Sequence, residues 1–358
     1  MRTFKNLLVT GGAGFIGSNF IRYILKDAGF QGSVINLDAL TYAGNPHSLE
    51  DLEKEFPERY IFVHGDICDK AMVNDVFDKY DIDAVCHFAA ESHVDRSIVS
   101  PDSFIQTNIV GTFNLLQAAR ERMDKLVLFH HVSTDEVFGS LGEEGMFSET
   151  TPYCPHSPYS ASKASSDHIV RAYHDTYGLP VTISNCSNNY GPYQFPEKLI
   201  PLMILNALEG KPLPVYGEGL NVRDWLFVED HCSAIWTIMQ KAELGETYTI
   251  GGRCELKNID VVNRICALVD KLAAPLPSGE PRTSLITYVK DRPGHDLRYA
   301  IDCTRLEQTF GWKQTVDADS GFEKTVKWYL ENIEWIDTVR TGEYRNWINK
   351  NYSERNQE

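Results

Sequence analysis

A glycine-rich turn near the N-terminus restricts the possible folds more than any other feature. The apolar residues 7–9 lead into the run TGGAGFIG at residues 10–17, which contains Gly-x-Gly-x-x-Gly at Gly12, Gly14 and Gly17. Glycine permits the tight turn and lets the backbone approach a pyrophosphate, while the N-terminus of the next helix supplies free N–H donors. Because a strand pattern precedes the run and a helix pattern follows it, we predict a dinucleotide site rather than an ordinary strand–helix connection.

The first two-thirds of the chain alternate strand and helix patterns. Predicted strands cover residues 7–10, 34–37, 60–64, 84–88, 126–132 and 181–186, and predicted helices cover 15–28, 70–80, 102–120 and 159–177. Apolar strands that alternate with helices are typical of a parallel sheet covered on both faces. We therefore expect an α/β fold, a Rossmann-type doubly wound parallel sheet with a smaller C-terminal α/β substrate-binding domain.

The end of the second predicted strand indicates which dinucleotide binds. Asp38 follows the glycine turn at the spacing of about 20 residues at which a carboxylate binds the adenosine ribose hydroxyls and repels a 2′-phosphate. No Arg or Lys lies between Asp38 and Asn45, which favours NAD over NADP. Asp66 ends the third predicted strand, where it is either an adenine-side contact or a solvated strand-end acid.

The alternation of strands and helices ends near Pro192, where prolines and glycines become frequent. We expect residues 1–190 to form the NAD-binding Rossmann domain with the catalytic residues. Residues 191–337 should form mainly the substrate-binding domain, with some segments returning to the first domain, and residues 338–358 a polar tail. Helix patterns in the second part lie at 229–241, 259–272 and 319–332.

Charge and composition exclude several partner classes. The formal net charge of -16 disfavours nucleic acid and anionic membranes, which require clustered positive charge. The N-terminal apolar run is too short for a signal peptide, and no stretch is long enough for a membrane span. We expect a cytoplasmic protein whose eight scattered cysteines are reduced and which holds no metal.

A tyrosine and a lysine four residues apart mark a candidate reaction centre. Tyr159 and Lys163 would share one face of a predicted helix, so that the ammonium could stabilise the phenolate and lower the pKa of the tyrosine. Ser133 and Thr134 end the preceding strand and can hydrogen-bond the same substrate hydroxyl. Taken alone, this spacing is more often an ordinary surface pair; the glycine turn in the same chain favours catalysis.

The residues around this centre resemble the extended short-chain dehydrogenase/reductase superfamily and, within it, the dTDP-glucose 4,6-dehydratase family. That family carries its acid and base in the segment STDEV, present here at residues 133–137. The resemblance reaches to about residue 329. Further matching runs are AAESHVDRS at 89–97, NCSNNYGPY at 185–193, PEKLIP at 196–201, VRDW at 222–225 and DRPGHD at 291–296.

The resemblance implies an NAD-dependent hydro-lyase that converts dTDP-glucose to dTDP-4-keto-6-deoxyglucose and water, as in deoxysugar (for example rhamnose) nucleotide biosynthesis. Tyr159 would take the proton of the C4 hydroxyl while hydride passes to NAD. Glu136 would remove the C5 proton, and Asp135 would protonate the departing C6 hydroxyl. The catalytic residues implied are Thr134, Asp135, Glu136, Tyr159 and Lys163.

The same resemblance implies binding residues and a homodimer formed by two helices of each subunit. The cofactor residues are Gly11, Gly12, Gly14, Phe15, Ile16, Gly17, Asp38, Asp66, Ile67, Phe88, Ala89, Ala90, Ser92, Thr107, Tyr159, Lys163 and Asn189. The residues for the nucleotide diphosphate hexose are Ser92, Thr134, Asn188, Lys198, Leu199, Pro214, Tyr216, Arg223, Asn258, Arg292 and His295.

Two departures and several alternatives accompany this interpretation. Ala39 stands where many relatives have Lys, and Phe138 where Tyr is common. Adjacent residues on a strand point to opposite faces, so the chain must turn at Asp135 if both acids are to reach one sugar. A nucleotide-sugar 4-epimerase or a UDP-glucuronate decarboxylase would share the glycine turn and the Tyr/Lys pair without needing the acid pair. A non-catalytic NAD-binding or scaffold protein would need neither the acid pair with Thr134 nor the Tyr/Lys pair.

Overall fold

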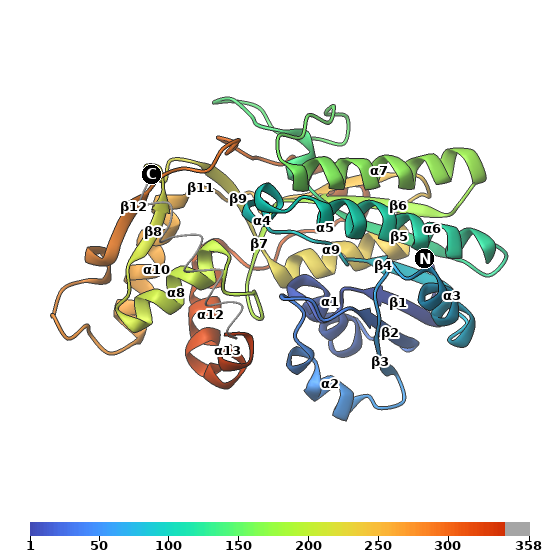
Figure 1. The fold of residues 1–358 in the computed structure, drawn as a ribbon, viewed down its shortest axis with the longest axis horizontal. Helices are drawn as coiled ribbons and strands as arrows, with labels where there is room; N and C mark the ends of the chain where they lie inside the picture. Colours follow the sequence, from blue (N-terminus) through green and yellow to red (C-terminus); the bar gives the residue numbers. More distant parts are fainter. Residues whose placement is uncertain (341–358) are drawn as a thin grey trace.

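The computed structural model of this 358-residue chain describes residues 1–340. Its main element is a seven-stranded sheet in the order β10-β6-β5-β4-β1-β2-β3, in which every pair of neighbours is parallel (Figure 1). The order reverses between β1 and β4, and ligands bind at such a reversal, outside the carboxyl ends of the strands. The strands are β1 Asn6–Thr10, β2 Ser33–Asp38, β3 Tyr60–His64, β4 Ala84–His87, β5 Leu128–Thr134, β6 Val181–Cys186 and β10 Thr247–Ile250.

Helices cover both faces of this sheet, as the strand–helix alternation predicts. One face carries α3, α6 and α7, and the other carries α1 and α9 (Figure 1). The helical segments of this body are α1 Phe15–Lys26, η1 Pro46–Ser48, α2 Glu50–Glu55, α3 Lys70–Lys79, α4 Val94–Val99, α5 Asp102–Phe104, η2 Ile105–Gly111, α6 Thr112–Glu121, η3 Asp135–Phe138, α7 Pro158–Tyr177, α9 Val228–Lys241 and α11 Thr304–Phe310.

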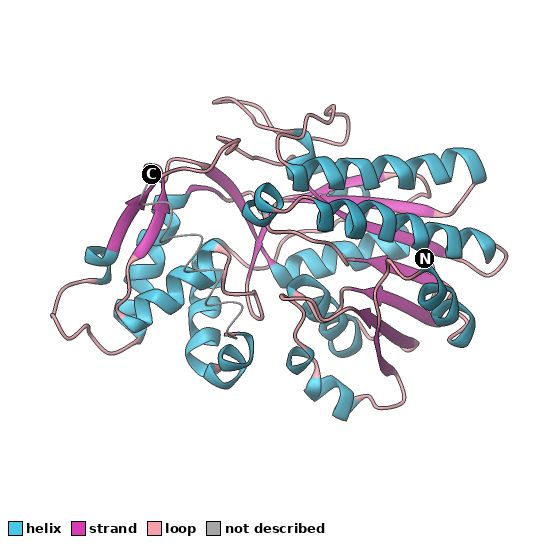
Figure 2. Cartoon of the chain, viewed as in Figure 1, coloured by secondary structure: helices cyan, strands magenta, loops and turns pink. Residues whose placement is uncertain are grey.

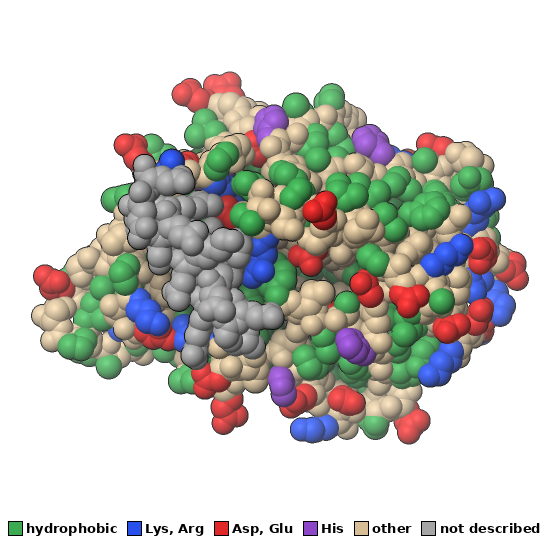
Figure 3. Space-filling model, in the orientation of Figure 1, with side chains coloured by type: hydrophobic (Ala, Val, Ile, Leu, Met, Phe, Trp, Pro, Cys, Tyr) green, Lys and Arg blue, Asp and Glu red, His purple; other side chains and the backbone are tan. Residues whose placement is uncertain are grey.

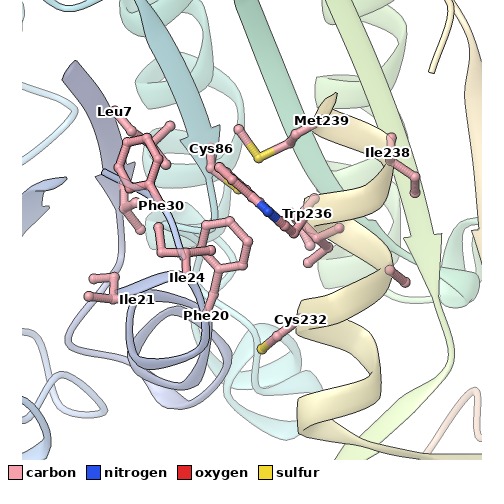
Figure 4. Close-up of a cluster of buried hydrophobic side chains, with 14 of the residues drawn as sticks. Leu7, Phe20, Ile21, Ile24, Phe30, Cys86, Cys232, Trp236, Ile238 and Met239 are labelled. Atoms are coloured by element: carbon pink, nitrogen blue, oxygen red, sulfur yellow. The ribbon is translucent and has the colours of Figure 1, made fainter. Parts of the chain in front are cut away.

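The two faces of the sheet bury different side chains of the same strands. Leu7 and Val9 of β1 pack into the cluster beneath α1 and α9, whereas Leu8 packs into the cluster beneath α3, α6 and α7. In the first cluster Trp236 of α9 lies among Phe20, Phe30 and their neighbours (Figure 4). Side chains on both faces of the central strands are buried, which is the pattern of a parallel sheet covered on both sides.

A smaller body lies beside the carboxyl ends of the strands (Figures 1 and 2). It contains two small sheets, β11-β9-β7 and β12-β8, and four longer helical elements. Its segments are β7 Asn188–Tyr190, β8 Leu213–Tyr216, β9 Val222–Phe227, β11 Glu255–Lys257, β12 Ile286–Val289, α8 Leu199–Glu209, α10 Asn258–Leu272, η4 Arg282–Leu285, α12 Ala318–Glu331 and α13 Ile333–Val339.

Several predicted boundaries in the sequence differ from the structure. The helix predicted at 102–120 is three segments, because the chain passes through the π-helix η2 between α5 and α6. The sequence predicts no helix at α8, because prolines are frequent after residue 192. Pro201 lies in the first turn of this helix, where its missing N–H costs little. The tail predicted from residue 338 begins inside α13, and residues 341–358 of it lie outside the described residues.

Candidate active site

The glycine turn joins β1 to α1 and leaves no room for side chains. Gly11 has φ +70°, and a Cβ on it would lie 2.7 Å from the backbone of Ala89. Gly14 and Gly17 line a cavity with Gly11. Gly12 does not line it: a Cβ there would collide with the side chains of Asn36 and Ile21. Gly12 is therefore required for packing of α1 on the sheet, and the other glycines bring the backbone to the cavity.

The two predicted carboxylates of the cofactor site, Asp38 and Asp66, line the same cavity as the glycine turn. Asp38 is buried, and its two oxygens accept hydrogen bonds from the backbone N–H groups of Ala13 and Leu40, at 2.8 Å each. Burial raises the pKa of the Asp38 carboxyl, and these N–H donors oppose the rise. Asp66 also lines the cavity and accepts a hydrogen bond from Cys68 N at 2.8 Å. Each carboxylate keeps free lone pairs for ribose or adenine donors.

One cavity of about 320 Å³ runs from the glycine turn to the reaction centre. The predicted site residues that line it are Gly11, Gly14, Phe15, Ile16, Gly17, Asp38, Asp66, Ile67, Phe88, Ala89, Ala90, Ser92, Thr107, Thr134, Asp135, Glu136, Tyr159, Lys163, Asn188, Asn189 and Lys198. The predicted residues outside this lining are Gly12, Leu199, Pro214, Tyr216, Arg223, Asn258, Arg292 and His295.

The cavity lining presents buried polar atoms that no described residue satisfies. These atoms are Ser133 Oγ, Asp135 Oδ2, Ser187 Oγ, Asn188 Oδ1, Asn189 Oδ1 and Gln194 Oε1. Buried polar atoms in proteins nearly always have a hydrogen-bond partner, so these atoms are suited to a polar ligand. Together with the glycine cradle and the ribose-type carboxylate Asp38, they fit a dinucleotide and a sugar lying end to end.

The proposed acid and base lie on a short 3₁₀ turn. β5 ends at Thr134, whose hydroxyl accepts a hydrogen bond from Glu136 N at 3.3 Å and so caps η3. The turn changes the direction of the chain at Asp135, and both acids line the cavity. Burial raises the pKa of Asp135 well above its usual value, and the Glu136 charge raises it further. Burial also raises the pKa of Glu136, but Arg292, Lys198 and Arg223 oppose that rise.

Tyr159 and Lys163 lie one turn apart on α7, which begins with Ser157 as its N-cap. Both are buried, and Lys163 Nζ donates to Val132 O at 2.9 Å. Burial raises the pKa of the Tyr159 phenol well above its usual value, and the Glu136 carboxylate raises it further. The pKa of the phenol is therefore raised overall, although the Lys163 ammonium acts in the lowering direction. The positive charge of an oxidised nicotinamide would act in the lowering direction.

A second group of polar residues extends from the cavity toward the smaller body. Lys198 Nζ donates to Ser92 O at 2.9 Å, and Arg223 donates to Asp296 O at 2.9 Å. Tyr216 Oη donates to Asp95 Oδ2 at 3.0 Å, and Arg292 Nη1 lies 3.8 Å from Asp95 Oδ1. These four predicted residues come from distant segments, and three of them, Lys198, Arg223 and Arg292, lie close enough to Glu136 for their charges to act on it.

The remaining predicted substrate residues take varied positions. The His295 ring lies 6.2 Å from that of Tyr216 and contacts Asp291 at 2.6 Å. Asn258 Oδ1 and Arg292 Nε are buried and have no partner among the described residues, so both are available to a ligand. Leu199 of α8 packs partly buried against the hydrophobic cluster of the smaller body, and Pro214 lies half-buried in β8.

Sequence reasoning missed other residues of the cavity. Tyr42, Cys186, Ser187, Gln194 and Glu197 all line it. Glu197 is buried and lies 3.1 Å from Arg96 Nε. Ser187, Gln194 and Glu197 lie within or beside the family runs at 185–193 and 196–201, so these runs could have indicated them as site residues. No sequence pattern indicates Tyr42. Phe138, a departure from the family, stacks on Phe147 at 5.1 Å and lies outside the cavity lining.

Comparison with known proteins shows the family to which this chain belongs. The model of the family described as GDP-mannose 4,6 dehydratase matches residues 8–325. A dTDP-glucose 4,6-dehydratase of Neisseria meningitidis is 56% identical over 350 residues, which cover 95% of this chain and 98% of that protein. The Escherichia coli dTDP-glucose 4,6-dehydratase 1 is 54% identical over 365 residues, covering 98% of this chain and 99% of that one. The chain belongs to the dTDP-glucose 4,6-dehydratase family.

Solved structures separate this family from its epimerase relatives. The dTDP-glucose 4,6-dehydratase of Streptomyces venezuelae, solved with NAD, has a TM-score of 0.86 at 46% identity and covers 94% of this chain and 100% of its own. The UDP-glucose 4-epimerase of Thermus thermophilus, also with NAD, has a TM-score of 0.80 at 27% identity, covering 91% and 99%. The chain is thus an NAD-dependent hydro-lyase with the Rossmann-type fold.

Proposed function

We propose that this protein dehydrates dTDP-glucose to dTDP-4-keto-6-deoxyglucose with the residues of the cavity described above. The observation that carries the proposal is the acid pair Asp135 and Glu136, which one 3₁₀ turn directs into the cavity that also holds Tyr159. An epimerase needs only oxidation and renewed reduction at C4. Two carboxyl groups beside the oxidising tyrosine supply the additional proton transfers that loss of water requires.

NAD, when bound, would supply the acceptor for the hydride of C4 and the donor of the hydride to C6. Tyr159 removes the proton of the C4 hydroxyl, assisted by the Thr134 hydroxyl beside it. Lys163 lies one turn further along α7, where its ammonium favours the phenolate form of Tyr159. Gly11, Gly14 and Gly17 admit the pyrophosphate, and Asp38 binds the ribose.

The elimination step divides the two carboxyl groups by role. The C4 ketone acidifies the C5 proton, and Glu136 removes it as the base. Three cations near Glu136 favour its ionised form, whereas burial and the Glu136 charge favour protonated Asp135. Asp135 therefore supplies the proton with which the C6 hydroxyl leaves as water. Two neighbouring acids with unequal environments can act as acid and base at one pH.

The polar group that extends into the smaller body is suited to the nucleotide diphosphate. Lys198, Arg223 and Arg292 supply positive charge, and guanidinium groups bind oxyanions through paired N–H donors. We assign residues 1–190 to the NAD-binding domain and 191–337 mainly to the substrate-binding domain. The return of α9 and β10 to the main sheet supports the expected exchange of segments between them.

A homodimer through the helices on one face of the main sheet is also proposed. Ile105, Phe113 and Tyr177 on η2, α6 and α7 expose 44%, 41% and 41% of their surfaces. Figure 3 shows hydrophobic side chains over these helices. Such a contiguous apolar surface favours association. A Phe113→Glu variant should shift the protein to the monomer in analytical ultracentrifugation, and an unchanged sedimentation coefficient would remove this face as the interface.

We also place the protein in the cytoplasm. All eight cysteines, which lie within residues 1–340, are free thiols, as is usual in a reducing compartment. Within the same residues there is no helix long and apolar enough to cross a membrane, and no cluster of three or more His, Cys, Asp or Glu side chains suited to a metal ion.

The decisive experiment incubates the purified protein with dTDP-glucose in deuterated water and analyses the product by mass spectrometry. UDP-, CDP- and GDP-glucose are run alongside to rank the nucleotide preference. Loss of one water with deuterium gained at C5 is the expected result. A product of unchanged mass, or an epimerised sugar, would replace the dehydratase assignment with an epimerase and remove the roles given to Asp135 and Glu136.

A further inference from the structure

α7 carries a third ionisable side chain in line with Tyr159 and Lys163. Asp167 lies one turn beyond Lys163 on the same face of the helix, and its side chain is completely buried. Its Oδ2 accepts hydrogen bonds from Tyr153 Oη at 2.7 Å and Asn185 Nδ2 at 3.2 Å. Its Oδ1 lies 3.1 Å from His131 Nε2. Asp167 does not line the cavity, so it contacts neither cofactor nor sugar.

The carboxyl group of Asp167 is ionised despite its burial. Burial acts to raise its pKa, but His131, Lys163 and Tyr153 together lower the pKa below its usual value. His131 does not supply the balancing charge. Burial and the Lys163 charge lower the pKa of His131 to about 4, so this ring is neutral near pH 7. Lys163, one turn back on the same face of α7, is the charged side chain among the three that lower this pKa.

Lys163 in turn depends on that carboxylate. Burial lowers the pKa of the Lys163 ammonium, and the charge of Asp167 is the largest influence in the opposite direction, followed by Cys186 on β6. From the strands beneath α7, the rings of His87 and His131 face the same ammonium, and both have lowered pKa values that keep them neutral. Among the described residues, Val132 O accepts the hydrogen bond from Nζ.

Asp167 is also connected to the acid–base turn. Asn185 Nδ2 donates both to Asp167 Oδ2 and, at 3.1 Å, to the carbonyl of Thr134. Tyr153 Oη, which donates to Asp167, accepts a hydrogen bond from Arg171 at 2.7 Å. The carboxylate therefore has a fixed position beneath the end of β5, where Thr134 begins the turn that carries Asp135 and Glu136.

We propose that Asp167 is a positioning residue that acts through Lys163: its buried carboxylate, one turn along the same helix face, keeps the lysine ammonium charged beside Tyr159. Without it, a buried lysine surrounded by neutral histidines loses its proton readily. The loss would remove the positive charge that favours the Tyr159 phenolate. This inference rests on the roles proposed above for Tyr159 and Lys163.

The test follows the C4 oxidation step, because Asp135 acts as a proton donor only in the later elimination. In a Glu136→Gln background, which stops the reaction after oxidation, the rate of appearance of reduced nicotinamide is measured against pH. Adding Asp167→Asn should move the high-pH decline of this rate downward by about one pH unit or more, since loss of a nearby opposite charge shifts a pKa by that order. A decline that coincides with that of Glu136→Gln alone would overturn the inference.

Tyr153→Phe is the matched control. It removes one hydrogen bond to Asp167 and leaves the charge in place, so the protein should lose a similar amount of thermal stability while the high-pH decline stays where it was. If Tyr153→Phe moves the decline as far as Asp167→Asn does, the effect is structural and the electrostatic role is wrong.

A second measurement applies even if Asp167→Asn does not fold. Wild-type holoenzyme labelled with carbon-13 at the lysine Cε positions is titrated by NMR, and the Lys163 signal is assigned by its loss in Lys163→Arg. We expect this lysine to be protonated at pH 7, although burial lowers its pKa below the ordinary lysine value. A neutral amine at pH 7 would overturn the inference. If wild type forms no keto sugar, the proposed function fails instead, whatever the lysine titration shows.

Discussion

Asp135 and Glu136 are neighbours in the sequence, yet both face the same cavity, because a 3₁₀ turn capped by Thr134 begins at Asp135, directly after the strand. On a continuing strand the two side chains would point to opposite faces of the sheet. Gly139 ends the turn with φ +88°, a conformation that favours glycine, and a Cβ at this position would collide with the Cys154 carbonyl. Because each carboxyl group can be replaced without the other, mutation can separate the two proposed roles.

Glu136→Gln should allow oxidation at C4 and stop the elimination. The amide is nearly isosteric but cannot accept the C5 proton, so reduced cofactor should accumulate on the enzyme and turnover should fall about 10²–10⁴-fold. Near-ultraviolet absorbance after mixing with dTDP-glucose measures the accumulation. Full turnover in this variant would contradict the assignment of Glu136 as the base.

Tyr159→Phe should abolish the oxidation itself. The ring packing against Phe104 remains, but no group takes the C4 hydroxyl proton. In the wild type the pKa of Tyr159 is raised by burial and by Glu136, so the oxidation rate should first increase as pH rises and more phenolate forms. Stopped-flow absorbance at several pH values measures both. Reduced cofactor forming at the wild-type rate in Tyr159→Phe would refute the role.

Asp38→Asn should weaken NAD binding by about tenfold or more and narrow the preference for NAD over NADP, because the charge that repels a 2′-phosphate is lost. One amide nitrogen would also oppose a backbone N–H of Ala13 or Leu40, which now donates to the carboxylate. Calorimetric titration of cofactor-free protein with both dinucleotides measures the effect. Asp66→Asn, in the same cavity, is the control and should leave the preference unchanged.

His231→Leu should stabilise the fold, and more so in acid. His231 is fully buried in α9, and neither ring nitrogen has a partner among the described residues. Burial lowers its pKa from 6.5 to about 3. The unfolded chain therefore binds a proton below pH 6.5 that the folded chain does not, so stability is lost as pH falls from 6.5 toward 3.

The expected gain from His231→Leu at pH 5 exceeds the gain at pH 7.5 by about 2 kcal/mol, from the proton that only the unfolded histidine binds. Urea unfolding at the two pH values measures the difference. The exposed His168 on α7 provides a control, since His168→Gln should leave the pH dependence unchanged. Equal gains at both pH values would show that His231 is protonated in the folded state.

The features that local spacing could reveal were found in the sequence. The glycine turn, the apolar strands and the ribose-binding Asp38 follow from patterns of a few residues, because the backbone of a tight turn and a doubly buried strand restrict the residue types directly. The spacing of four positions from Tyr159 to Lys163 indicates one helix face for the same reason. The resemblance of the runs at 89–97, 133–137 and 185–201 then supplied the chemistry.

Other parts of the site depend on contacts between distant segments. Asp95, Lys198, Arg223 and Arg292 meet only when the smaller body packs beside the sheet, and the strands of that body are three to six residues long, too short for a clear pattern. The overall upward shift of the Tyr159 pKa could not be read from the sequence, because burial and the Glu136 charge act through space.

The sequence by itself therefore determined the fold class and the cofactor and indicated the proposed catalytic side chains, since each is expressed in short-range spacing or in family runs. The tertiary structure alone decided how Asp135 and Glu136 share a cavity, which cations surround Glu136, and that Asp167 lies buried behind Lys163. Those relationships depend on burial and on charges a few ångströms apart in space, and neither quantity is set by distance along the chain.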